Sequence, residues 1–106
     1  MKKIIWISYD LGVRGDYSGL YEWLDNHDAK ECGDGVAVLQ YEVNNSNLVE
    51  ELKKDLSQKV KFEKRDRVYV VWQDEKKTKG RFVFGRRKST PWQGYGSNDL
   101  EPDEDF

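Results

Sequence analysis

Few residues of this chain belong to the types that form disulfides or metal clusters. Its 106 residues include one cysteine, Cys32, and one histidine, His27. A disulfide within the chain is therefore excluded, and a site built from several cysteine and histidine ligands is not expected. No apolar run approaches the roughly 20 residues that a membrane span needs, and the N-terminus lacks the layout of a signal peptide. We therefore expect a cytoplasmic protein that does not enter a membrane.

The composition is polar, yet it does not predict disorder. Charged residues make up 36% and hydrophobic residues 37% of the chain, and the mean hydropathy is -0.92. Aromatic residues nevertheless reach 13%, and the apolar residues gather into periodic runs. A length of 106 residues suits one hydrophobic core. We expect a single folded domain with a thin core that is rich in aromatic rings.

The net charge of -2 conceals three segments of different sign. Residues 1–51 carry ten acids and four bases, residues 52–98 carry five acids and fourteen bases, and residues 99–106 carry five acids and no base. Such an asymmetry is typical of a surface for nucleic acid or for an acidic partner. The last segment is interpreted as a solvated acidic tail, which could equally shield the basic segment of the same chain.

Apolar periodicity predicts five strands and two helices. Asp16 is placed to cap the first helix, and Asn47 with Glu50 to cap the second. Gly19 costs the first helix about 1 kcal/mol relative to alanine, which we interpret as room for close packing onto the sheet. Residues 74–80 are expected to form a polar turn. The expected strands are residues 3–9, 29–32, 36–43, 68–72 and 81–85, and the expected helices are residues 17–28 and 48–59.

The order strand, helix, strand, strand, helix, strand, followed by one more strand, is that of a ferredoxin-like α+β sandwich. We therefore predict an antiparallel sheet of four to five strands with two helices on one face. Right-handed crossovers place the first and third strands side by side at its centre. The domain is expected to span residues 1–88. Residues 89–106 then form a C-terminal arm, which carries Trp92 and Tyr95, and the acidic tail.

Particular stretches within these elements carry a family resemblance. The first strand ends in Tyr9 and Asp10, the third begins with Val-Ala-Val-Leu-Gln-Tyr over residues 36–41, and Asp-Arg-Val-Tyr-Val-Val over residues 66–71 leads into the fourth. Over residues 3–86 the chain resembles a superfamily that includes the small CRISPR adaptation subunit (CRISPR-associated endoribonuclease-like) and its relative, virulence-associated protein D. It differs from the adaptation subunit by an acidic first helix and by its arm and tail.

The resemblance implies a homodimer, in which the sheets associate through edge strands or the C-terminal strand. Members of this group include metal-dependent ribonucleases and deoxyribonucleases. In those members the aspartate that ends the first strand is the proposed metal ligand, and the matching residue here is Asp10. Other members are scaffolds that hold a DNA duplex across the dimer. The resemblance thus implies either a toxin-like nuclease with Asp10 as its catalytic and metal-binding residue, or a non-catalytic dimeric module that binds nucleic acid or protein.

Coordination chemistry allows a metal at Asp10 only when a second copy takes part. Mg²⁺ prefers oxygen ligands, and two symmetry-related Asp10 carboxylates near a dimer axis could hold one ion. One chain alone supplies too few ligands, although Ser8 on the same side of the strand or Asp16 across the turn could assist. The alternative is structural: Asp10 caps the turn that follows it or pairs with Arg14.

A basic segment with interleaved aromatic residues follows the fourth strand. Cationic groups bind phosphates, and rings such as those of Phe82 and Phe84 stack on bases. The same alternation also fits an ordinary solvated hairpin or an intramolecular partner of the acidic tail. The candidates for contact with RNA or DNA are Arg81, Arg86, Arg87 and Lys88.

Three other aromatic side chains have structural interpretations beside functional ones. His27 lies at an apolar position of the first helix, where a packed or helix-end histidine is expected and a general base is the alternative. Trp92 and Tyr95 could form a platform for a peptide or nucleotide. In a domain with a thin core, these rings are instead expected to clamp the arm onto the domain or onto a second subunit. Whether the chain is an enzyme stays open.

Overall fold

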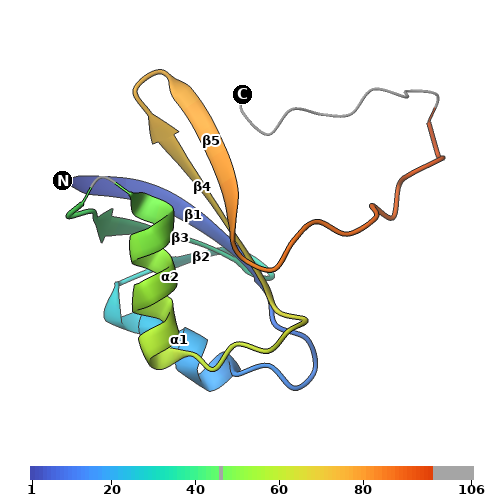
Figure 1. Ribbon diagram of the computed structural model, residues 1–106, viewed down its shortest axis with the longest axis horizontal. Coiled ribbons are helices and arrows are strands. Elements are labelled where there is room, and N and C mark those ends of the chain that lie inside the picture. Colours follow the sequence, from blue (N-terminus) through green and yellow to red (C-terminus); the bar gives the residue numbers. More distant parts are fainter. Residues whose placement is uncertain (46, 97–106) are drawn as a thin grey trace.

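The computed structural model describes residues 1–45 and 47–96, which form an antiparallel sheet and two helices (Figure 1). The elements are β1 (Lys2–Asp10), α1 (Tyr17–Asn26), β2 (Lys30–Gly33), β3 (Val36–Glu42), α2 (Leu48–Lys59), β4 (Arg67–Asp74) and β5 (Lys77–Phe84). The five strands follow the order β2-β3-β1-β4-β5, and both helices lie on one face of the sheet. The fold is α+β and compatible with a ferredoxin-like sandwich, which confirms the predicted class and the pairing of β1 with β3.

The central strand β1 divides its side chains between the two faces of the sheet. Ile5 and Ile7 are fully buried and belong to one apolar cluster with Leu20 of α1 and Leu52 of α2. Burial of such a side chain stabilises a fold by about 1.5–3 kcal/mol. The alternating residues of β1 are exposed, among them Trp6, so they lie on the face away from the helices.

We call the face without helices, among the described residues, the outer face. Directly paired residues of neighbouring strands project to the same side of a sheet, so the register defines the members of this face. They are Lys2, Ile4, Trp6, Ser8 and Asp10 of β1, Lys30 of β2, Val36, Val38, Gln40 and Glu42 of β3, Arg67, Tyr69, Val71 and Gln73 of β4, and Thr78, Gly80 and Phe82 of β5.

The two helices are joined at the entry of α1 and the exit of α2. The Asp16 carboxylate accepts the N–H of Gly19 at 3.0 Å as the predicted cap, and it also accepts the N–H of Lys61 at 3.0 Å. A side chain at Gly19 would collide with the backbone carbonyl of Lys59. The glycine therefore allows α1 to approach the end of α2, whereas we expected it to allow packing onto the sheet.

The hairpin between β4 and β5 is tighter than the sequence predicted. A polar turn was expected over residues 74–80, but Asp74 pairs with Lys77 and only two residues, with Glu75 at a φ of 57°, connect the strands. β5 begins at Lys77 instead of residue 81. β5 is an edge strand, and edge strands tolerate charged side chains because these reach solvent. Its lysines therefore indicate a turn in the sequence, although they belong to a strand.

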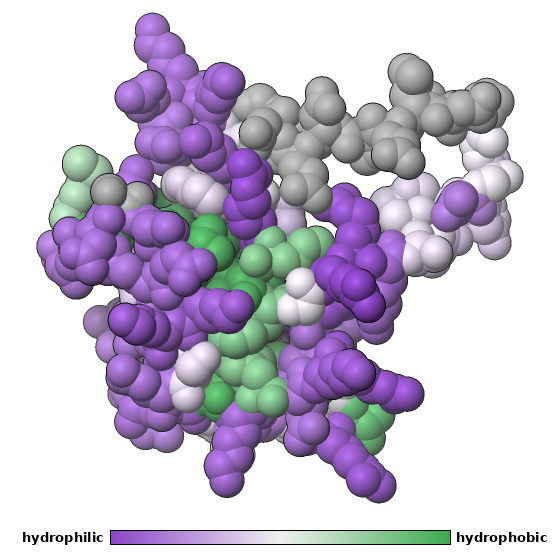
Figure 2. All heavy atoms as spheres, in the orientation of Figure 1, coloured by the Kyte–Doolittle hydropathy of each residue, from purple (hydrophilic) through white to green (hydrophobic). Residues whose placement is uncertain are grey.

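Figure 2 views the molecule from the side of the helices, where hydrophilic side chains surround a strip of apolar ones beside α2. Phe62, which follows α2, stacks on Phe84 of β5 with 3.7 Å between the ring centroids. The ammonium of Lys53 lies 5.9 Å from the Phe84 ring. Among the described residues, no helix is long and apolar enough to cross a membrane.

Residues 85–96 form neither helix nor strand. Trp92 is 69% and Tyr95 is 89% exposed, so the expected packing of these rings onto their own domain is wrong. Packing of the rings onto a second subunit stays a prediction. The predicted acidic tail, residues 99–106, lies outside the described residues.

Candidate functional site

The outer face carries an apolar belt across its three central strands. Trp6 is 43% exposed and Ile4 is 51% exposed, although both belong to the central strand of the sheet. Trp6 pairs directly with Val38 of β3 on one side and with Val71 of β4 on the other. Large exposed side chains at the centre of a sheet indicate a surface for a partner, since isolated domains usually bury such positions.

Two further rings continue this belt toward β5. Tyr69 and Phe82 pair directly and meet edge to face, with 4.8 Å between their ring centroids. Gly80 leaves space for the Tyr69 ring, with which any added side chain would collide. The guanidinium of Arg87 lies 5.8 Å from the Phe82 ring, a cation–π geometry. We call Trp6, Tyr69, Phe82 and Arg87 the aromatic platform.

Exposed cations lie around the platform, toward both edges of the sheet. Lys30 of β2 pairs with Val38, which itself pairs with Trp6, and Lys2 lies at the start of β1 on the same face. Beyond β5, Arg86 and Lys88 are exposed beside Arg87. A surface with rings at its centre and cations at its margins suits a ligand with stacked groups and a negatively charged backbone.

Asp10 lies on the outer face, at the end of β1. Its Oδ1 accepts the N–H of Gly12 at 3.3 Å, and its Oδ2 pairs with Nη2 of Arg67 at 3.4 Å. The structural alternative is thus confirmed for the turn, while its ion pair joins Asp10 to Arg67 and not to Arg14. The carboxylate remains 59% exposed. Within residues 1–45 and 47–96, no group of three or more His, Cys, Asp or Glu side chains could hold a metal ion.

The predicted basic residues do not form one surface. Arg81 pairs with Val70, which is fully buried on the helix face, and its Nη1 donates to the carbonyl of Gly80 at 2.7 Å. Arg87 contacts the outer face through Phe82. The strand register of Arg81 and the ring contact of Arg87 therefore place these two residues toward opposite faces of the sheet. The run of basic residues in the sequence does not reveal this separation. Whether any of them binds nucleic acid stays a prediction.

A second polar site, absent from the sequence analysis apart from His27, lies where α1, α2 and β3 meet. One oxygen of Asp55, Oδ2, accepts the indole N–H of Trp23 at 3.2 Å and the hydroxyl of Tyr41 at 3.3 Å. The Nε2 of His27 lies 3.6 Å from the same oxygen. Burial, and then the nearby Asp55 carboxylate that accepts its proton, raise the pKa of the Tyr41 hydroxyl. Tyr41 therefore stays protonated and acts as a donor.

His27 itself is a helix-end residue, as expected. α1 ends at Asn26, two residues earlier than predicted, and His27 follows as its C-cap. The imidazole stacks on Trp23 with 4.0 Å between centroids, and its Nδ1 is 2.8 Å from the Trp23 carbonyl oxygen. The ring is thereby held with Nε2 toward Asp55. The chain then turns at Asp28, which has a φ of 54°.

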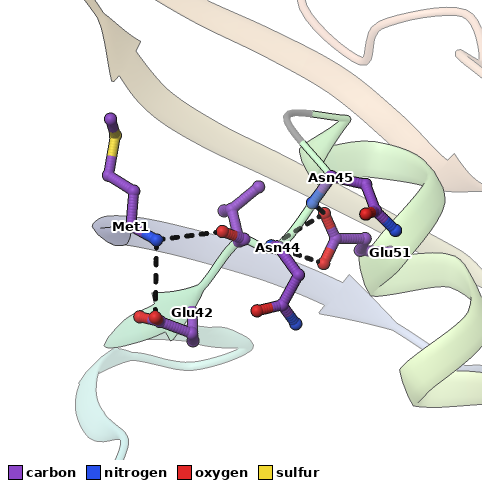
Figure 3. Close-up of polar contacts among 6 residues, drawn as sticks. Met1, Glu42, Asn44, Asn45 and Glu51 are labelled. Atoms are coloured by element: carbon purple, nitrogen blue, oxygen red, sulfur yellow. Dashed lines mark hydrogen bonds and ion pairs between the residues drawn. The ribbon is translucent and has the colours of Figure 1, made fainter.

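His27, Asp28, Tyr41 and Asp55 line an open groove of about 720 Å³. We call it the β3 groove. One wall is a polar stripe of α2 whose members follow the helical spacing of three and four residues. Figure 3 shows this wall at the start of α2, where Glu51 accepts the backbone N–H groups of Asn44 and Asn45 at 2.8 Å. The lining residues are Lys2, His27, Asp28, Gln40, Tyr41, Glu42, Asn44, Glu51, Lys54, Asp55 and Gln58.

Comparison with known proteins adds no assignment. No family model, no curated protein and no solved structure matches this chain. The resemblance to the CRISPR adaptation subunit and virulence-associated protein D therefore stays a prediction, and the two sites must be interpreted from their own chemistry.

Proposed function

We propose that this protein binds single-stranded nucleic acid on its outer face, with the aromatic platform stacking on the bases. The observation that carries the proposal is the exposure of Trp6 on the central strand, on the same face as the paired rings of Tyr69 and Phe82. Diagonal neighbours on adjacent strands lie about 7–8 Å apart, so Trp6 and Tyr69 can each receive a base of one extended strand. Stacking contributes about 1–3 kcal/mol per base.

The charges around the platform favour a polyanion. Exposed cations lie on one side, Lys2 and Lys30, and on the other, Arg86 and Lys88. The two acids of the outer face are paired, Asp10 with Arg67 and Glu42 with the Met1 ammonium. Phosphate contacts by such cations give salt-dependent affinity. A single strand fits better than a duplex, because a duplex keeps the faces of its bases stacked inside the helix.

A binding titration tests this proposal. Labelled single-stranded RNA, single-stranded DNA and duplex DNA are titrated at two salt concentrations with the wild type, Trp6→Ala and Tyr21→Ala. Tyr21 is a matched control, because it is an aromatic residue that is 54% exposed but lies on α1. Trp6→Ala should weaken single-strand binding by about 5- to 100-fold, as the loss of one stacked base predicts, and Tyr21→Ala should not.

Two outcomes would overturn the proposal. One is an unchanged affinity of a folded Trp6→Ala variant. The other is a protein that binds no nucleic acid and whose dimer dissociates on Trp6→Ala, which would make the outer face a contact between two copies. Sedimentation of both variants without nucleic acid separates these cases.

Metal-dependent cleavage is the second candidate function, because Asp10 lies on the same face as the platform and its carboxylate is 59% exposed. We propose that two copies of the chain would be needed to complete an Mg²⁺ site, since each contributes one such carboxylate. Labelled RNA and DNA are incubated with Mg²⁺, Mn²⁺ or a chelator, and with Asp10→Asn. Cleavage that is lost both with the chelator and in Asp10→Asn supports a nuclease. Absent cleavage, or cleavage unchanged in the variant, removes this candidate and leaves the binding module.

A further inference from the structure

The sheet has a short open edge at the β3 groove. β2 pairs with β3 only from Lys30 opposite Val38 to Gly33 opposite Val36. In the described chain, residues 39–42 have a strand partner on the β1 side alone. An edge strand presents unpaired N–H and C=O groups at every second residue. Four residues at about 3.3 Å each leave roughly 13 Å of such an edge.

The chain itself cannot fill this edge by a longer β2. Residues that precede Lys30 would have to continue opposite residues 39–42. Asp28 instead adopts a φ of 54°, and the N–H of Ala29 donates to the carbonyl of Leu24 at 3.0 Å. The chain just before β2 therefore bends back toward α1 and cannot extend β2 along β3. His27 and Asp28 thus lie at one end of the edge, and within residues 1–45 and 47–96 the rest of it borders the open groove.

The lining of the groove around this edge is acidic. Four carboxylates line it against two lysines, Lys2 and Lys54. Asp55 is held in place by Trp23 and Tyr41. Glu42 pairs with the Met1 ammonium at 3.4 Å (Figure 3) but is 55% exposed. The four carboxylates are those of Asp28, Glu42, Glu51 and Asp55.

We propose that the β3 groove receives an extended peptide segment of another protein that carries lysine or arginine, and that this segment adds as a strand to residues 39–42. Main-chain hydrogen bonds to the edge supply affinity. Alternate side chains of the bound segment point toward the groove wall or toward the outer face. The acids of the wall select cationic side chains. They also disfavour a second copy of this chain at the same edge, because its own Glu42 and Asp28 would face the same acids, and they disfavour a nucleic acid. The inference does not rest on nucleic-acid binding, although Lys2 and Glu42 border both the groove and the outer face.

Peptide titrations followed by amide NMR test this site. The probe is an eight-residue peptide of alternating lysine and valine, compared with a glutamate–valine peptide and with a lysine–valine peptide in which two central valines are replaced by proline. The lysine peptide should shift the amide signals of residues 39–42. The acidic peptide should not bind, and the proline peptide should bind about tenfold more weakly, because two main-chain donors are lost.

Matched acidic positions test the role of charge. Asp28→Asn and Glu42→Gln should each weaken the lysine peptide by about two- to fivefold at low salt, as expected for exposed ion pairs. Asp34→Asn is the control, because Asp34 is an exposed acid in the turn between β2 and β3, at the other end of β3. All three substitutions lie on the surface and leave the buried core untouched.

Several results would overturn the inference. The first is that the lysine peptide fails to shift residues 39–42 at millimolar concentration. The second is that the proline or glutamate peptide binds as tightly as the lysine peptide. The third is that these signals shift with protein concentration in the absence of peptide, because a second copy would then occupy the edge.

Discussion

The outer face and the β3 groove are surfaces of one sheet, and they offer opposite chemistry to a partner. The outer face combines exposed rings with cations at its margins, while the groove combines carboxylates with backbone groups that have no strand partner among the described residues. The difference follows from the alternation of side chains. Residues 40 and 42 of β3 lie on the outer face, whereas Tyr41 between them points toward Asp55. Lys2, Gln40 and Glu42 border both surfaces. A change at any other residue of one surface should leave the other surface intact.

The largest expected effect is a loss of stability from a substitution in the groove alone. Asp55→Ala removes the acceptor of Trp23 and Tyr41 and should lower the free energy of unfolding by about 2 kcal/mol, measured by urea denaturation. Lys54→Ala, the neighbouring exposed residue of the groove, is the control and should change stability little. Nucleic-acid affinity should stay within twofold of the wild type at temperatures where the variant is folded. A parallel loss of nucleic-acid binding would show that the two surfaces are not independent.

A substitution in the outer face should have the converse effect. Gly80→Ala introduces a methyl group that collides with the Tyr69 ring, at a cost of about 1 kcal/mol. Single-strand affinity should fall by about fivefold, while binding of the lysine peptide to the groove should not change. Tyr69→Phe combined with Gly80→Ala should recover part of the loss, because the hydroxyl oxygen is the atom nearest to the new methyl group. A double-mutant cycle on affinity measures this coupling, and strict additivity would contradict it.

Alkaline pH should affect the groove through Tyr41. The pKa of its hydroxyl is raised in the folded state, first by burial and then by Asp55. The unfolded chain therefore deprotonates first, at a pH of about 10, so this contribution to stability is present below pH 10 and is lost as the pH rises beyond it. Tyr41→Phe should show a shallower decline between pH 9 and 11 in urea denaturation. Equal declines in the two proteins would exclude the effect.

The smallest expected effect concerns acid. The N–H groups of Asn44 and Asn45 hold the pKa of the Glu51 carboxyl below its usual 4.5. This stabilisation is present above pH 4.5 and is lost as the pH falls through the folded-state value. Glu51→Gln should reduce the slope of stability between pH 5 and 3. Glu50→Gln, at an exposed neighbouring position, should keep the wild-type slope. If both variants behave alike, the capping contribution of Glu51 is negligible.

Local patterns in the sequence predicted much of the fold. The continuous apolar run of β1 and the periodic leucines of α2 yielded both elements within two residues of their ends. Asn47 accepts the N–H of Glu50 at 3.2 Å as a helix cap, as its position indicated. These predictions succeed because caps and amphipathic stripes depend on residues close together in the chain.

The groove could not be predicted in the same way. Trp23, Tyr41 and Asp55 come from three elements, and each is unremarkable within its own helix or strand. Only the packing of α1 and α2 against β3 brings the side chains of Trp23 and Tyr41 to one oxygen of Asp55. The one local signal was His27, a lone histidine at an apolar helical position. Likewise, the assignment of Arg81 and Arg87 to different faces depends on the register of β4 with β5.

The double use of the Asp16 carboxylate has a consequence for how the chain folds. One oxygen caps the start of α1 and the other accepts the N–H of Lys61, which is 45 residues away in the sequence. The Asp16 carboxylate therefore makes both hydrogen bonds only after the segment that follows α2 has packed beside the start of α1. The beginning of one helix and the end of the other should form together in a single cooperative step, with similar protection of the amides of Gly19 and Lys61 from hydrogen exchange.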